Sequence, residues 1–259
     1  MKGYFFLVTS LPQLHLGNPL DISWDELTFL LTSNLDKSDY NQVKALRLYY
    51  DLENIRSFWS GFPLSRFGNF NEVDLEQALV ARLGLPSYVY DFMARYDSKE
   101  ERLKHFSLLF ENYFEEQLHA SGWFLTQVFK MVRDVKVILT ALRAKTLGKD
   151  LLAELQFQDP QDSLIADILA QKDAKSYDPP EEYQEVKHLY ETHSESPLEL
   201  QKALLQYQFR KVDELIGLHI FTLDAVLSYV YRWILVERWS DLDQQKGKEI
   251  INSIVQGVA

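Results

Sequence analysis

Cysteine is absent from the 259 residues of this chain, and glycine and proline are scarce, with 10 and 8 residues. Without cysteine there is no disulfide, no thiolate nucleophile and no zinc or iron–sulfur site with a cysteine ligand, which is typical of a protein of the reducing cytosol. A strand-rich fold needs a turn every few residues, and such turns are rich in glycine and proline. The sequence therefore predicts a mainly α fold.

Positive charge is also in short supply, because 27 Lys and Arg face 38 Asp and Glu and the formal net charge is −11. Such a chain is repelled by nucleic acid and by anionic lipid, so we expect neither as a partner and expect a basic protein surface instead. Long apolar runs are missing as well. The segment 4–8 is too short for a signal peptide, and the apolar segment 218–236 contains Asp224 and Arg232, so we expect no transmembrane segment.

What the sequence does contain is a series of helix signals. Two capping boxes, Ser23 with Glu26 and Ser98 with Glu101, mark helix starts because their side chains satisfy free amides of the first turn. Residues 4–8 are aromatic and β-branched, which favours one short N-terminal strand. Apolar residues recur at helical spacing over the segments 23–34, 39–60, 72–83, 98–118, 123–147, 180–191, 197–218, 223–240 and 242–258.

Three of these segments contain a cation that precedes an aspartate, which suggests an internal repeat. The aspartates lie 83 and 79 residues apart, and the pairs are Arg47 with Asp51, Lys130 with Asp134, and Arg210 with Asp213. A fixed period of this length is typical of repeated helical units. We therefore expect three related units: 1–90, which includes the N-terminal strand and a loop, 91–175 and 176–259.

Two of the helices resemble a known family. The segments Tyr50–Arg56 and Arg133–Lys145 resemble the recurring D-x-x-N-I-(+)…L-R-A-K helix of the C-type central-stalk subunit of V-type and archaeal-type rotary ATPases, whose eukaryotic counterpart is the d-type stalk subunit. The opening Tyr4–Pro12 resembles the start of a poorly characterised bacterial family that is encoded beside V-type ATPase subunits. The second copy has Val137 where the motif has asparagine, and the third copy lacks the L-R-A-K ending.

The resemblance implies a non-catalytic subunit of the central stalk. A protein of this type is a cup of three quasi-equivalent helical domains that sits on the membrane rotor ring and receives the foot of the shaft. It couples shaft and ring for ion transport and for ATP synthesis or hydrolysis. The implied partners are the central shaft subunits and the rotor ring, and the implied location is the cytoplasmic face of the membrane, reached only through the complex. No catalytic residue, cofactor or metal is implied.

Two groups of residues are candidates for function. The polar residues of the repeat are expected to pair within a helix or to reach the neighbouring unit, and they are Arg47, Asp51, Asn54, Arg56, Lys130, Asp134, Arg210 and Asp213. A positive strip along one helix is expected to dock an acidic partner surface, and it consists of Arg133, Lys136, Arg143 and Lys145.

Two other interpretations fit the same sequence. One is a soluble all-α hydrolase or transferase with two carboxylates in a cleft, for which the candidates are Glu115 with Glu116, Glu181 with Glu182, and Asp241 with Asp243. The other is a generic helical adaptor without three-fold repetition. The six histidines lack the spacing of metal ligands on one helix face, so no metal site is expected in any of these cases.

Overall fold

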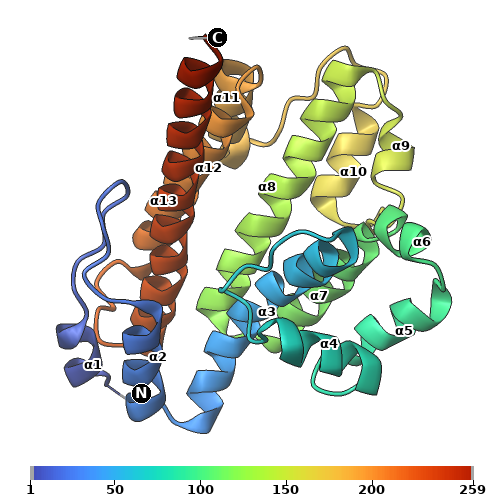
Figure 1. The fold of residues 1–259 in the computed structure, drawn as a ribbon. Helices are drawn as coiled ribbons and strands as arrows, with labels where there is room; N and C mark the ends of the chain where they lie inside the picture. The colour runs from blue at the N-terminus through green and yellow to red at the C-terminus, as the bar shows by residue number, and fades with distance from the viewer. Residues whose placement is uncertain (1–2, 258–259) are drawn as a thin grey trace. The chain divides into compact units, whose positions relative to one another are not determined.

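The computed structural model describes residues 3–257, with side chains for residues 3–243. All regular secondary structure in this part of the chain is helical, which confirms the mainly α prediction (Figure 1). Val258, the last residue of the predicted final helix, lies outside the described residues. The helices are α1 (Phe5–Ser10), α2 (Trp24–Asn34), α3 (Lys37–Ser60), α4 (Glu72–Ala81), α5 (Ser87–Arg95), α6 (Lys99–Lys104), α7 (Ser107–Ala120), α8 (Trp123–Leu147), α9 (Leu151–Glu154), α10 (Ser163–Ala170), the 3-10 helix η1 (Glu181–Tyr183), α11 (Gln184–His193), α12 (Pro197–Ile216) and α13 (Leu223–Gly257).

The predicted N-terminal strand is wrong, because α1 covers most of that segment. The Val8 N–H donates to the Tyr4 carbonyl at 2.9 Å, and the Thr9 hydroxyl donates to the Phe5 carbonyl at 2.8 Å. A lone strand would leave its backbone amides and carbonyls without partners, whereas a helical turn satisfies them locally. The helix also turns Leu7 into the core, where that side chain is 1% exposed.

The predicted helix starts at Ser23 and Ser98 are confirmed. The Ser23 hydroxyl accepts from the Glu26 N–H at 3.3 Å, and the Glu26 carboxylate accepts from the Ser23 N–H at 2.9 Å. The Ser98 hydroxyl accepts from the Glu101 N–H at 3.1 Å. Each bond satisfies an amide that the first helical turn leaves free, so these starts are determined by local sequence.

Two predicted helix boundaries differ from the structure. The segment 98–118 forms two helices, α6 and α7, because the chain turns at His105, whose ring stacks on Tyr96 with centroids 4.6 Å apart. The segments 223–240 and 242–258, predicted as two helices, belong to one helix, α13, as far as Gly257. Neither glycine nor proline occurs between Gly217 and Gly247, so nothing in the sequence breaks this helix near residue 241.

The chain divides into two compact units. Met1–Tyr40 and Asp178–Ala259 form the first, called the terminal unit below, and Asn41–Tyr177 form the second, called the central unit. The boundary falls in the first turn of α3, which begins in the terminal unit and continues in the central unit. The division into three consecutive units, 1–90, 91–175 and 176–259, stays a prediction.

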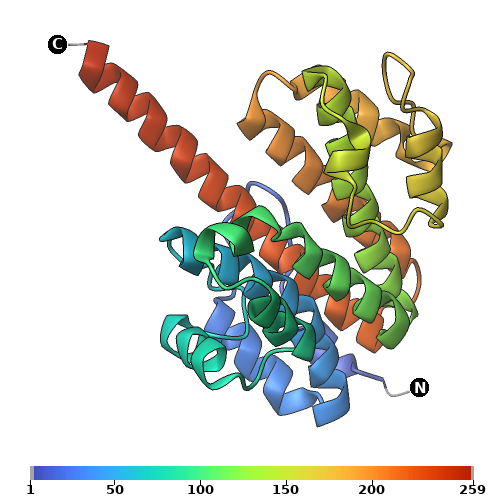
Figure 2. The same ribbon diagram turned by 90° about the vertical axis from the view of Figure 1, so that its right-hand side faces the viewer.

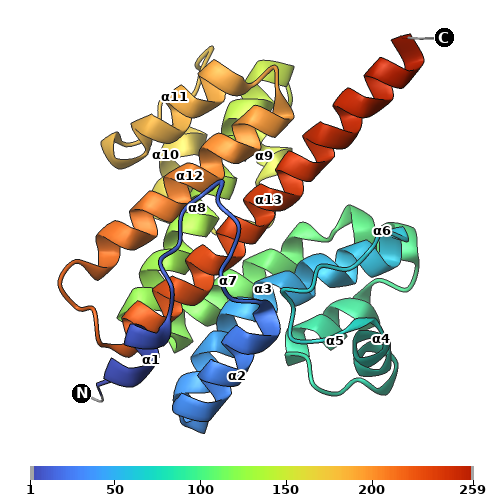
Figure 3. The ribbon, with the colours of Figure 1, turned by 60° about the vertical axis from the view of Figure 1, so that its left-hand side comes forward.

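The core of the terminal unit is built around α13, which packs against α12 and α1. Trp233 of α13 is fully buried, and its indole N–H donates to the Ile22 carbonyl at 3.1 Å. Its ring lies 4.9 Å from that of Trp24. In Figure 3 the segment that follows α1 runs along α13. The first forty residues are therefore anchored on the last helix of the chain.

The core of the central unit lies between α3, α7 and α8. The helices α7 and α8 pack side by side, which Figure 2 shows from a second direction. Tyr113 of α7 is fully buried and its hydroxyl donates to the Ala45 carbonyl of α3 at 3.2 Å. At its C-terminal end, α8 stops at Gly148, whose φ of +64° is a left-handed conformation that favours glycine.

Candidate functional site

The first copy of the repeat motif lies on the buried face of α3. Asp51 is 0% exposed and Asn54 is 1% exposed. The Asp51 carboxylate accepts from the Asn69 side-chain amide at 2.7 Å and from the Phe70 backbone N–H at 3.1 Å. Asn54 donates to the Ser65 carbonyl at 2.8 Å and accepts from the Ser65 N–H at 2.7 Å. Both side chains therefore bind the loop that follows α3.

Arg47 completes this arrangement one helical turn earlier. Its Nε donates to the Phe67 carbonyl at 3.0 Å and its Nη2 donates to the Gly68 carbonyl. Gly68 lies so close to α3 that a Cβ atom at this position would be 2.5 Å from Asp51 Oδ1 and 2.7 Å from Asn54 Nδ2. Arg47, Asp51 and Asn54 thus hold residues 65–70 against α3, and we call these three residues the loop clamp.

The loop clamp contains an aspartate with an altered acidity. Burial raises the pKa of Asp51 to about 6, although the hydrogen bonds from Asn69 and Phe70 and the charge of Arg47 act in the opposite direction. A carboxylate with such a pKa is a candidate general base in an accessible cleft. Asp51 is inaccessible and its oxygens are used by the loop, so the arrangement favours a structural role.

In the second copy of the repeat motif, on α8, Asp134 pairs with Arg133 and not with Lys130. Asp134 is 2% exposed and pairs with Arg133 at 3.4 Å, whereas Lys130 is exposed. Arg133 also pairs at 2.9 Å with Asp162, which caps the N-terminus of α10. Helix α8 is therefore tied to α10 by an ion pair that the spacing of Lys130 and Asp134 does not predict.

The third copy lies at the surface of the terminal unit. Asp213 pairs with Arg232 of α13, and Arg210 pairs with Glu185 at 2.6 Å and with Glu214 at 2.8 Å. The three aspartates of the repeat thus occupy a fully buried loop clamp, a buried ion pair and an ion pair in which the aspartate is exposed and the arginine is partly buried. Arg56, the cation of the first motif, is exposed on α3.

The predicted positive strip on α8 is not a continuous exposed surface, because three of its members make contacts inside the central unit. Arg133 pairs with Asp134 and Asp162, as described above. The ammonium of Lys136 lies 3.5 Å from the centre of the Phe110 ring. Lys145 donates to the Gln171 carbonyl at 2.8 Å and to the Ala174 carbonyl at 2.6 Å. Arg143 is the exposed member of the strip, and its docking role stays a prediction.

These contacts predict different effects of removing Lys145 and Arg143. We expect Lys145→Met to lower the free energy of unfolding by about 1–2 kcal/mol, because carbonyls at the end of α10 lose a charged donor. Arg143→Met, the matched control on the same helix, should change it by less than about 0.5 kcal/mol. Urea unfolding of both variants measures the difference. Equal values would mean that the Lys145 hydrogen bonds contribute nothing to stability.

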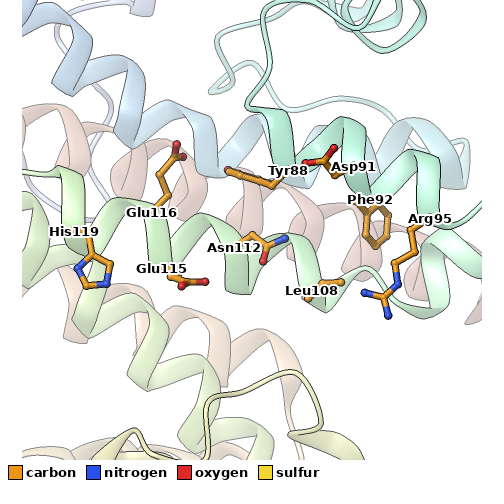
Figure 4. Close-up of a pocket in the computed structure, with 9 residues that line it drawn as sticks. All are labelled: Tyr88, Asp91, Phe92, Arg95, Leu108, Asn112, Glu115, Glu116 and His119. Carbon is orange, nitrogen blue, oxygen red and sulfur yellow. The ribbon is translucent and has the colours of Figure 1, made fainter.

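A groove of about 480 Å³ lies between α5 and α7 of the central unit (Figure 4). In the figure Glu115, Glu116 and His119 lie toward one end and Arg95 toward the other. The lining has three carboxylates and one guanidinium, so its net charge is negative. It consists of Tyr88, Asp91, Phe92 and Arg95 of α5 and of Leu108, Asn112, Glu115, Glu116 and His119 of α7.

Tyr88 lies in the middle of this groove with an unused hydrogen-bonding group. Its hydroxyl is buried and has no hydrogen-bond partner within the described residues. Burial, together with the charges of Glu116 and Asp51, raises the pKa of Tyr88, so the phenol stays protonated. The groove therefore combines three carboxylates with apolar lining residues, which suits a cationic, partly apolar segment of another protein.

The other predicted carboxylate pairs lie outside the two pockets described for this part of the chain. Glu181 and Glu182 are exposed on η1. Asp241 is exposed on α13, close to the last residue whose side chain is described, and Asp243 pairs with Lys202. Within the described residues, no three His, Asp or Glu side chains come close enough together to hold a metal ion. Of the three pairs, only Glu115 and Glu116 line one of the described pockets.

The same part of the chain contains no helix with the length and apolar character that a membrane span requires.

Comparison with known proteins places this chain among proteins without an assigned activity. A family model described as "Protein of unknown function (DUF2764)" matches residues 1–258. An "Uncharacterized protein" of Chlamydia muridarum is 31% identical over 265 residues, which cover 100% of this chain and 99% of the relative. A second "Uncharacterized protein", from Chlamydia trachomatis serovar D, is 30% identical with the same coverage. No solved structure matches the chain significantly.

Proposed function

The chain belongs to the DUF2764 family, and from this premise we propose that it is a non-catalytic subunit of a V-type rotary ATPase that acts at the central stalk. In this role it resembles the C-type stalk subunit and joins the shaft to the rotor ring during ion transport and ATP synthesis or hydrolysis. It is attached to the cytoplasmic face of the membrane through the complex and needs no cofactor.

The loop clamp is the observation that carries this proposal. The residues on which the resemblance to the C-type stalk subunit depends, Asp51 and Asn54, point into the protein and hold a loop. A catalytic motif would have to present its carboxylate to a substrate, whereas a motif that fixes helix packing belongs to a protein whose work is shape and contact. The buried position of Asp134 in the second motif supports the same interpretation.

The groove between α5 and α7 is the proposed contact with the stalk. Its carboxylates suit a basic segment of a partner, and its apolar lining residues, which include Phe92 and Leu108, provide area that such a segment can bury. The occupant is therefore a basic segment of a shaft or ring subunit.

Affinity purification tests the assignment. The tagged full chain is isolated from detergent-solubilised membranes of its native host, and its partners are identified by mass spectrometry. We expect the shaft, head and ring subunits of a V-type ATPase in a defined ratio. If none of them is recovered and the chain remains entirely in the soluble fraction, the stalk assignment is wrong.

Charge reversal tests the groove within the same experiment. The double variant Glu115→Lys/Glu116→Lys is expected to reduce recovery of the ATPase subunits at least tenfold, because like charges then face the basic segment. Glu181→Lys/Glu182→Lys changes the net charge by the same amount on the exposed η1 and serves as the control. Equal losses in the two variants would place the contact outside the groove.

A further inference from the structure

The terminal unit contains a pocket of about 630 Å³ between the segment after α1 and the helices α12 and α13. This volume lies within the range of about 300–1,000 Å³ that small-molecule sites occupy. Figure 3 shows the segment after α1 running along α13. Residues 11–15 of this segment line the pocket. The apolar lining residues include Val8, Leu11, Leu14, Phe209, Ile216 and Ile220, and polar lining is provided by Gln13, His15, Asp213, Tyr229 and Arg232.

Two polar side chains line the pocket with donors that nothing in the described chain satisfies. Tyr229 is 7% exposed, and its hydroxyl has no hydrogen-bond partner there. Arg232 bonds to Asp213 through Nη1, whereas its Nε is buried and has no acceptor. Leaving such groups without a partner is costly, and most buried donors in proteins have one. Two adjacent donors in an apolar pocket therefore call for a ligand with acceptor oxygens.

The charges around the pocket favour an anion. The Arg232 side chain is 21% exposed, and burial lowers its pKa, but a guanidinium stays protonated in proteins. Asp213 is 62% exposed, so water screens its charge more effectively than that of Arg232. Burial also raises the pKa of Tyr229, which keeps the phenol as a donor. The pocket thus presents two donors beside apolar walls, and Arg232 is the more buried member of an ion pair whose exposed carboxylate, Asp213, also belongs to the lining.

We propose that this pocket binds a small monocarboxylic acid with an apolar body. The two carboxylate oxygens accept hydrogen bonds from Tyr229 Oη and Arg232 Nε, and the hydrocarbon part contacts the apolar walls. An amine offers donors where the pocket already has donors, and an alcohol carries no charge for Arg232. This site lies in the terminal unit and its ligand does not depend on the ATPase assignment.

Titration calorimetry with the full chain tests the ligand class. The probes are decanoate, decanol and decylamine, which share one hydrocarbon chain and differ in the polar group. We expect decanoate to bind with one site per chain and the other two to bind at least tenfold more weakly. Equal binding of the three compounds, or no binding of decanoate at millimolar concentration, would overturn the proposal.

Three variants test the position of the site. Tyr229→Phe removes only the hydroxyl and should weaken decanoate binding about tenfold, the equivalent of one hydrogen bond to a charged group. Asp213→Asn removes the carboxylate that competes with the ligand for Arg232, so this variant should bind decanoate more tightly. Tyr231→Phe is the control, because Tyr231 Oη donates to Gln208 at 2.8 Å and is not part of the lining.

A stability measurement shows whether a loss of decanoate binding in Tyr229→Phe comes from a loss of folding. The Tyr229 hydroxyl has no partner in the described chain, so Tyr229→Phe should unfold at the same urea concentration as the unmodified protein or at a higher one. If Tyr229→Phe and Tyr231→Phe bind decanoate with the same affinity, the carboxylate does not bind at Tyr229 and the proposed site is wrong.

Discussion

Replacing Gly68 by alanine is expected to lower the free energy of unfolding by about 3 kcal/mol. The new Cβ would lie 2.5 Å from Asp51 Oδ1 and 2.7 Å from Asn54 Nδ2, distances that no real Cβ contact sustains. Either the loop 65–70 moves away or the two side chains rotate, and both movements break hydrogen bonds of the loop clamp. Overpacking costs about 1–3 kcal/mol and an unsatisfied buried group costs a similar amount. Urea unfolding measures the loss.

Gly122 provides the control for this substitution. It precedes α8 as the N-cap residue, and a Cβ there would meet only the flexible end of Gln42, at 3.4 Å. Serine is a good N-cap residue, so Gly122→Ser should leave stability unchanged or raise it by about 0.3 kcal/mol. If Gly68→Ala were as stable as Gly122→Ser, the close approach of the loop to α3 would not exist in solution.

Replacing Asp51 by asparagine is expected to change how stability depends on pH. The pKa of Asp51 is about 6 in the folded protein and 3.8 for a free side chain. A carboxyl with a raised folded pKa binds its proton more tightly when folded, so its ionisation destabilises the protein fully above pH 6 and not at all below pH 4. At 1.36 kcal/mol per pKa unit, this corresponds to about 3 kcal/mol. The difference in stability between the unmodified protein and Asp51→Asn should therefore shift by most of this amount, about 2 kcal/mol, in favour of the unmodified protein, as the pH falls from 7 to 4.

Urea unfolding of both proteins at several pH values between 4 and 7 gives this difference directly. The substitution keeps an acceptor for Phe70, and Asn69 can turn its free Oδ1 toward the new amide. Asp178→Asn serves as the opposite case, because hydrogen bonds from Lys187 and Gln184 lower the pKa of Asp178. Its contribution to stability is lost as the pH falls. A constant difference between Asp51→Asn and the unmodified protein would mean that Asp51 titrates normally.

The parts of the fold that could be predicted from sequence depend on short-range interactions. Ser23 with Glu26 defines a helix start within four residues, and the scarcity of glycine and proline defines the fold class. The N-terminal segment was not predictable in this way, because the Tyr4 N–H donates at 2.9 Å to the carbonyl of Phe221. The composition of residues 4–8 contains no information about a hydrogen-bond partner as distant in sequence as Phe221.

The residues of the loop clamp could be predicted from the sequence, but the contacts that they make could not. Helical spacing identifies Arg47 and Asp51 as neighbours on one face of α3, but it does not reveal that a loop packs on that face. The signal that the sequence does contain is Gly68 beside Asn69 after the end of the helix, since a glycine in a loop often marks a close backbone approach. The sequence contains no signal for the α5 side of the groove, because Tyr88 and Arg95 belong to no motif.

The two ends of the chain build the terminal unit together, and this has a consequence for biosynthesis. The bond from Trp233 to Ile22 joins residues separated by 211 positions. On the ribosome the first forty residues emerge long before α12 and α13 exist, whereas the central unit is complete once Tyr177 has been translated. Domains generally fold as units during synthesis, and contacts of long sequence separation form late. The apolar residues of the newly made N-terminal segment therefore stay uncovered by α12 and α13 until translation is nearly finished.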